Sequence, residues 1–166
     1  MYASRTIRSS GEPSLRLAFA LLAAGIAAVS MVALAPAAPF PAERYPLAPV
    51  GGEPLTSGFV ENIHPDGPEI YARHVYVLNG ARSDESYEVF ISIWATNTEC
   101  MGAATFVLPV AVLQTNGTGN GRAGVVHTPE QLDALGIRGL TIGGEVTFLR
   151  GRSLAYATGC QVVDLD

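Results

Sequence analysis

Turn-forming residues recur at short intervals after about residue 55, and they constrain the fold of this chain more than any other feature. The runs between them are short and rich in β-branched and aromatic residues, which is typical of strands. Turn signals spaced about 8–12 residues apart predict an all-β, antiparallel β-sandwich of about 7–8 short strands, immunoglobulin-like or related. Candidate strand runs are residues 55–63, 71–78, 86–96, 105–115, 122–127, 137–142, 144–149, 153–157 and 161–165.

Two of these runs allow more detailed predictions. Residues 86–96 alternate in character, so one face of the expected strand should carry Tyr87, Val89, Ile91 and Ile93. In residues 105–115, Pro109 cannot donate a hydrogen bond to a neighbouring strand. This second strand is therefore expected at a sheet edge or with a bulge.

One short helix is predicted near residues 129–135. Thr128 is a suitable N-cap, Pro129 suits the first helical position, and Gln131 completes a capping box. Gly136 should end the helix after about two turns, because glycine accepts the left-handed conformation found at helix ends.

The N-terminal segment has the pattern of an export signal. Arg5, Arg8 and Arg16 precede an uncharged, largely apolar run that ends in small residues. Residues 1–37 are expected to be a signal peptide cut before Ala38 or, alternatively, an uncleaved membrane anchor. Either outcome places a Pro/Gly-rich spacer (38–54) and a β-sandwich domain (55–166) outside the cytoplasm, in the envelope or secreted.

The charge of the exported part excludes one class of partner. All basic residues of the chain are arginines, and after Ala42 seven of them stand against fourteen acidic residues. A nucleic-acid-binding protein needs a basic surface to neutralise phosphates, and this chain lacks one. Anionic lipid headgroups are disfavoured for the same reason, so membrane contact is expected only through an uncleaved N-terminal segment.

Cys100 and Cys160 are the only cysteines. In an oxidising compartment an even number of cysteines indicates a disulfide, here between the loop after a central strand and the last strand. Closing a loop of about 60 residues stabilises a fold by roughly 4 kcal/mol. A redox pair or two metal-binding thiolates are the alternatives, but the spacing matches neither a Cys-x-x-Cys motif nor a zinc site.

No catalytic or cofactor-binding residue is predicted. The chain contains no Gly-x-Ser-x-Gly motif, and its carboxylates cluster in expected turns, where solvation accounts for them. Three histidines, His64, His74 and His127, could meet at a metal site in a sandwich. Their spacing matches no established ligand pattern, so a metal-binding protein or metalloenzyme is kept as an alternative hypothesis.

A resemblance can be stated from the central part of the chain. Ser86-Tyr87-Glu88-Val89, Cys100, and the sequence Val112-Leu113-Gln114-Thr115-Asn116 before Gly119-Asn120-Gly121 resemble small exported bacterial β-sandwich proteins of uncharacterised function. The resemblance covers residues 71–128 and implies the fold, with no functional residue. The leading expectation is a non-catalytic extracellular or envelope binding module for a glycan or protein partner. A structural subunit that assembles through strand edges is a further alternative.

Overall fold

The described part of the protein is a sandwich of two antiparallel sheets. The computed structural model describes residues 42–63 and 72–165. The four-stranded sheet has the order β1-β3-β4-β7, formed by Ala42–Pro46, Ser57–Ile63, Ala72–Asn79 and Gly121–His127. The second sheet has six strands, of which five follow the order β2-β9-β8-β5-β6, formed by Ala48–Pro49, Ser153–Ala157, Leu140–Arg150, Ser86–Trp94 and Phe106–Gln114. The sixth strand pairs with β8 beside this path. These sheets confirm the predicted all-β sandwich.

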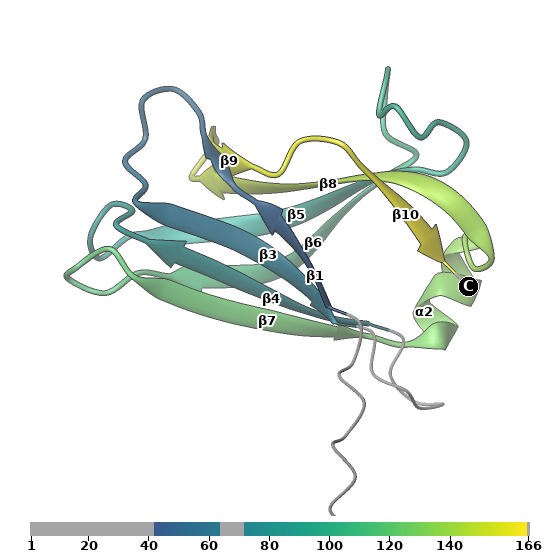
Figure 1. Ribbon diagram of the computed structural model, residues 1–166, viewed down its shortest axis with the longest axis horizontal. Helices are drawn as coiled ribbons and strands as arrows, with labels where there is room; N and C mark the ends of the chain where they lie inside the picture. Colours follow the sequence, from purple (N-terminus) through teal and green to yellow (C-terminus); the bar gives the residue numbers. More distant parts are fainter. Residues whose placement is uncertain (1–41, 64–71, 166) are drawn as a thin grey trace, which may run out of the picture. The chain divides into compact units, whose positions relative to one another are not determined.

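The last strand, β10 (Gln161–Leu165), pairs with the first half of β8, while β9 pairs with the second half. The helix α2 (Pro129–Leu135) lies between β7 and β8 in the chain. Figure 1 shows that the two sheets splay apart toward α2, which spans the space between them at that end. The arrangement therefore leaves the interior widest near the helix.

The expected spacer is corrected for residues 42–49. These residues form β1, which pairs with β3 from Ala42↔Ile63 to Pro46↔Phe59, and β2, which pairs with β9. Their proline content hides the strand signal, because proline removes a backbone donor. Both strands lie at sheet edges, where proline is tolerated. Residues 1–41, which include the predicted leader, lie outside the described residues.

The two strands expected at residues 137–142 and 144–149 are one continuous strand, β8. Gly143, which separates the two expected strands, is extended within the ladder and pairs with Trp94. A Cβ on Gly143 would lie 2.5 Å from the carbonyl oxygen of Asn97 and 3.0 Å from Sγ of Cys100. Glycine is therefore needed where the loop after β5 passes closely over β8. The two-residue β2 and the added β1 also explain why the structure has more strands than expected.

Pro109 occupies both of the settings predicted for it. Its strand, β6, is the edge of the six-stranded sheet. The pairing of β5 with β6 shifts between Val89 and Phe90, which leaves Val110 as the extra residue of a bulge. On β5, Tyr87, Val89 and Ile93 are buried, as the alternation predicted.

The helix has the predicted bounds and caps. The backbone N–H of Thr128 donates to Oε1 of Gln131 at 3.0 Å, and Gly136 ends the helix with a φ of 66°. The buried residue of this helix is Leu132, which faces the interior of the sandwich.

The predicted disulfide is also present. Cys100 and Cys160 are bonded, with their Cα atoms 5.8 Å apart. The bond joins the loop after β5 to the residue that directly precedes β10, so it fixes the start of that strand. A disulfide indicates an extracellular or otherwise oxidising environment. In the described part of the chain no helix is long and apolar enough to cross a membrane.

The hydrophobic core is divided into two clusters. The larger one lies between the sheets and is built around the buried aromatic residues Tyr76, Tyr87, Phe148 and Tyr156. The smaller one lies near α2 and contains Ile93, Leu132, Ile137, Ile142 and Leu165. The two clusters share partly buried contacts with Ile91. The space between them is the site described next.

Candidate functional site

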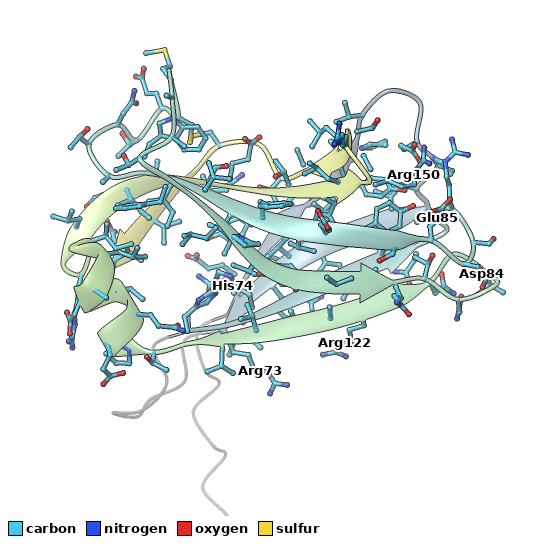
Figure 2. The ribbon with its side chains drawn as sticks, turned by 180° about the vertical axis from the view of Figure 1, so that it is seen from behind. Arg73, His74, Asp84, Glu85, Arg122 and Arg150 are labelled. Atoms are coloured by element: carbon cyan, nitrogen blue, oxygen red, sulfur yellow. A yellow bond between two sulfur atoms is a disulfide. The ribbon has the colours of Figure 1, made fainter. Side chains whose placement is uncertain are left out.

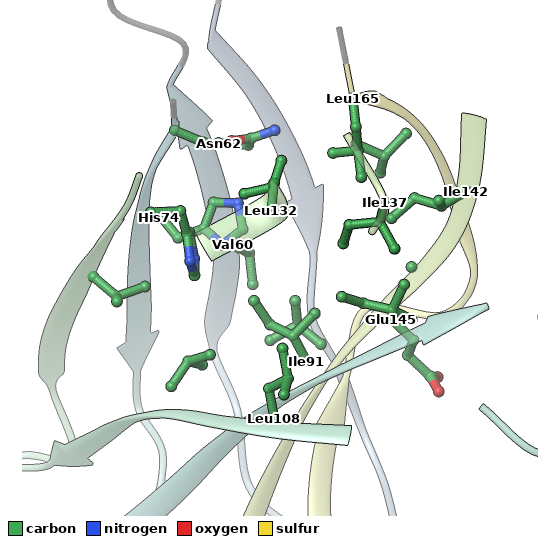
Figure 3. A pocket seen from close by; sticks show the side chains of 18 of the residues that line it. Val60, Asn62, His74, Ile91, Leu108, Leu132, Ile137, Ile142, Glu145 and Leu165 are labelled. Atoms are coloured by element: carbon green, nitrogen blue, oxygen red, sulfur yellow. The ribbon is translucent and has the colours of Figure 1, made fainter. Parts of the chain in front are cut away.

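A cavity of about 480 Å³ lies between the two sheets. Its walls include residues of both core clusters, so it interrupts the core where the sheets splay apart. Figure 3 shows Val60 from β3 on one side and Ile91 and Leu108 from β5 and β6 on the other. Leu132 from α2 closes the end of this space. The volume falls within the range of about 300–1,000 Å³ typical of small-molecule sites.

The wall contributed by the C-terminal half of the chain depends on the disulfide. Val163 and Leu165 of β10 line the cavity together with Ile142 of β8. Because β10 has β8 as its paired neighbour and follows Cys160 directly, the disulfide helps to hold this wall in place.

One part of the lining is polar. Asn62 on β3 pairs with His74 on β4, and His127 on β7 pairs with Ala72, two residues from His74. The His74 and His127 rings lie edge to face, with centroids 4.7 Å apart. The Tyr76 hydroxyl lies 3.5 Å from Nδ1 of His74. Three polar side chains from neighbouring strands therefore meet on the inner face of the four-stranded sheet.

Burial determines the protonation state of two side chains on the polar wall, His127 and Tyr45. Burial lowers the pKa of His127 below its usual value, so its imidazole is neutral near pH 7. Burial raises the pKa of Tyr45, and a hydrogen bond to Glu43 raises it further, so the Tyr45 hydroxyl stays protonated. A side-chain hydrogen bond also joins Tyr45 to Asn62. His127 and Tyr45 consequently present neutral hydrogen-bonding groups to the cavity.

Ionised side chains contribute little to the cavity interior. Glu145 of β8 is among the lining residues, but Figure 3 shows its carboxylate directed away from the apolar side chains. Within the described residues, no arginine lines the cavity. Arg73 and Arg122 project from the outer face of the four-stranded sheet, away from His74 (Figure 2).

The three predicted histidines are brought together only in part. His74 and His127 are neighbours, whereas His64 lies outside the described residues. Among residues 42–63 and 72–165 no group of three His, Cys, Asp or Glu side chains could hold a metal ion. The metal site therefore stays a hypothesis with two of its proposed ligands adjacent.

A partly exposed ionic cluster at the other end of the sandwich has a structural explanation. The Glu53 carboxylate accepts hydrogen bonds from Nε of Arg82 at 2.7 Å and from an Nη of Arg150 at 2.8 Å. Burial by itself would raise the pKa of Glu53, but the two arginines outweigh it and lower the pKa. Figure 2 shows Arg150 and Glu85 at this end, remote from α2. The cluster joins the segment before β3, the loop after β4 and the end of β8.

Asn62 and the cavity itself were not predicted from the sequence. Asn62 on β3 is a polar residue, yet it is 3% exposed. Asn62 is two residues from Val60, and residues two apart in a strand face the same side of a sheet. The alternation of the strand therefore offered a signal that Asn62 faces inward. The cavity had no such signal, since its walls consist mostly of ordinary core residues from eight strands, α2 and the segments beside them.

The fold and the site together define an all-β sandwich with an apolar cavity between its sheets. No family model, curated protein or solved structure matches the chain.

Proposed function

We propose that this protein is a non-catalytic binding module that holds a small, largely apolar molecule between its two sheets. The observation that carries the proposal is the cavity of about 480 Å³, which is bounded by both core clusters and lined mainly by apolar side chains. A concave apolar site with a few convergent polar groups is the usual form of a small-molecule site. This proposal replaces the broader expectation of a glycan or protein ligand with a specific class.

The space between the sheets is much larger than the voids of a close-packed core, and it is partly open to solvent. The space is therefore occupied by solvent or by a ligand. Apolar walls hold water poorly, which favours an apolar occupant.

The proposed setting is outside the cytoplasm. The basic and apolar pattern of residues 1–37 and the disulfide support export, with the leader either removed before Ala38 or retained as an anchor. N-terminal sequencing of the native protein distinguishes these outcomes. An N-terminus at Ala38 supports cleavage, and one at Met1 supports retention.

The binding proposal is tested with a neutral fluorescent probe. N-phenyl-naphthylamine should bind the folded protein saturably, with one probe per chain, and decanol should displace it. Protein unfolded in urea is the control, since it has the same composition and no cavity. An organic extract of protein purified from its native source, analysed by mass spectrometry, should contain an apolar small molecule. Absence of saturable probe binding would contradict the proposal.

A metal-binding role is the second candidate, favoured by the adjacent rings of His74 and His127. His64 would supply the third ligand in this hypothesis. Elemental analysis of protein purified from its native compartment decides it, because a resident site should hold stoichiometric metal. Assembly through strand edges is the third candidate. The edge strand β6 exposes Val107 and Val112, and such assembly predicts concentration-dependent oligomers in light scattering.

A further inference from the structure

We propose that the bound molecule is electrically neutral and that its single polar end, a hydroxyl or carbonyl group, hydrogen-bonds to His127. This inference rests on the proposed function, because it names the chemistry of the ligand held in the same cavity. Its basis is the distribution of charge and of hydrogen-bonding groups around the lining.

The charges around the lining disfavour an ionised ligand. In the part of the chain that the structure describes, the lining contains no arginine that could balance a carboxylate or phosphate. The acidic groups nearby are Glu145 in the lining and Glu43, which accepts a hydrogen bond from the lining residue Tyr45. An anionic headgroup would lose its hydration without a compensating arginine. A cationic headgroup would lose its hydration without a facing carboxylate, because that of Glu145 points away from the apolar side chains and Glu43 is bonded to Tyr45.

Most other polar groups of the lining already have hydrogen-bond partners. Oε1 of Gln131 accepts the Thr128 backbone N–H at 3.0 Å. Oγ1 of Thr158 accepts the Val146 backbone N–H at 3.0 Å and donates to the Gly159 carbonyl at 2.9 Å. Nε2 of Gln161 donates to the carbonyl of Thr158 at 3.3 Å. These side chains hold the helix and the loops around β9 and β10 in place.

His127 differs from these lining side chains in its hydrogen bonding. Its Nε2 atom is buried and has no hydrogen-bond partner among the described residues. Buried polar atoms in folded proteins nearly always have a partner, so an exception requires an explanation such as a ligand or solvent. A neutral imidazole has one donor and one acceptor nitrogen, so it can bind a hydroxyl or a carbonyl group.

The position of His127 fits an amphiphile with one polar end. The residue ends β7, directly before α2, and it lies against His74 at one side of the lining. The remaining walls, from Val60 across to Ile91 and Leu108, are apolar. A chain whose hydroxyl reaches His127 would extend its hydrocarbon along these walls.

The test compares ligands that share one hydrocarbon chain and differ at the polar end. Decanol, decanoate and decylammonium are used to displace N-phenyl-naphthylamine at about pH 8, where the acid and the amine are both charged. We expect decanol to bind at least about tenfold more tightly than either charged ligand. All three ligands are tested on the wild-type protein, so no substitution alters the fold or the oligomeric state.

Variants of His127 locate the polar contact. His127→Leu should weaken decanol binding about three- to tenfold and leave decane binding unchanged, because only the alcohol loses a hydrogen bond. His127→Gln supplies a donor and an acceptor and should restore part of the loss. Circular dichroism of each variant verifies that it is folded.

The outcomes separate this inference from the function on which it rests. Equal or tighter binding of decanoate or decylammonium overturns the inference and leaves the proposed function intact. An equal loss of decanol and decane affinity in His127→Leu also overturns it, because the side chain would then act through packing alone. Failure of the wild-type protein to bind the probe or any decyl ligand refutes the proposed function itself.

Discussion

Replacing Leu108 with tryptophan should obstruct the cavity from β6 and weaken the binding of an apolar ligand by about sixtyfold. Leu108 lines the cavity and points toward Ile91 (Figure 3). Its neighbour Val107 points to the opposite face of the edge strand and is 59% exposed. Val107→Trp is therefore a matched control that introduces the same side chain outside the cavity.

The magnitude follows from the hydrocarbon that the larger side chain displaces. Tryptophan exceeds leucine by roughly six heavy atoms, and burial of each methylene of a ligand is worth about 0.8 kcal/mol. Full displacement would cost a ligand about 5 kcal/mol. If the ligand recovers half of this by shifting within the remaining space, the loss is about 2.5 kcal/mol, or about sixtyfold in Kd. The cavity of about 480 Å³ has room for the indole, so the overpacking cost of about 1–3 kcal/mol should not arise.

The assay is a titration with N-phenyl-naphthylamine, excited where tryptophan does not absorb, together with urea unfolding of each variant. Leu108→Trp should lose affinity while remaining at least as stable as the wild-type protein, and Val107→Trp should match the wild type in affinity. Wild-type affinity in a folded Leu108→Trp variant would refute the assignment of binding to this cavity. An equal loss in Val107→Trp would do so as well.

Three further predictions concern stability. Gly143→Ala should destabilise the protein by about 1–3 kcal/mol in urea unfolding, because the new Cβ would meet the Asn97 carbonyl. Gly144→Ala, whose Cβ would lie 3.7 Å from Val163, should change stability little, and equal effects would contradict this account of β8. Replacing Cys100 and Cys160 together with serine should cost about 4 kcal/mol and weaken probe binding by loosening β10. The wild-type protein with its disulfide reduced should show the same losses of stability and probe affinity. Unchanged probe affinity would show that β10 stays paired with β8 without the disulfide. Because burial lowers the pKa of His127 in the folded state, the unfolded state binds more protons as pH falls below about 6.5. Wild-type stability should therefore decrease below this pH relative to His127→Gln, and parallel stability profiles would contradict the pKa shift.

Local chemistry made several elements predictable. The helix at residues 129–135 follows from Thr128, Pro129 and Gln131, all of which act within one helical turn. The bulge and the edge position of β6 follow from Pro109, whose missing N–H excludes it from an interior strand. In each case the residues that determine the structure are close together in the chain.

Elements that depend on distant partners were not predictable in the same way. The segment that forms β1 lies in a proline-rich stretch of the sequence, and its strand conformation comes from pairing with β3. The continuity of β8 through Gly143 and Gly144 depends on β5, β10 and the loop at residues 97–100. Asn62 was detectable in principle from the strand alternation, but its burial depends on which face of β3 the other sheet covers.

The amino-acid sequence by itself determined the all-β class, the acidic charge without a basic surface, and the pair of cysteines that form the disulfide. These properties depend on composition, short-range periodicity and residue counts. Only the tertiary structure decided that the sheets splay toward α2, that the core divides into two clusters, and that His74 and His127 meet beside an apolar cavity. The physical reason is that a cavity is a property of the space between elements, and ordinary core residues line it as readily as they fill a closed interior.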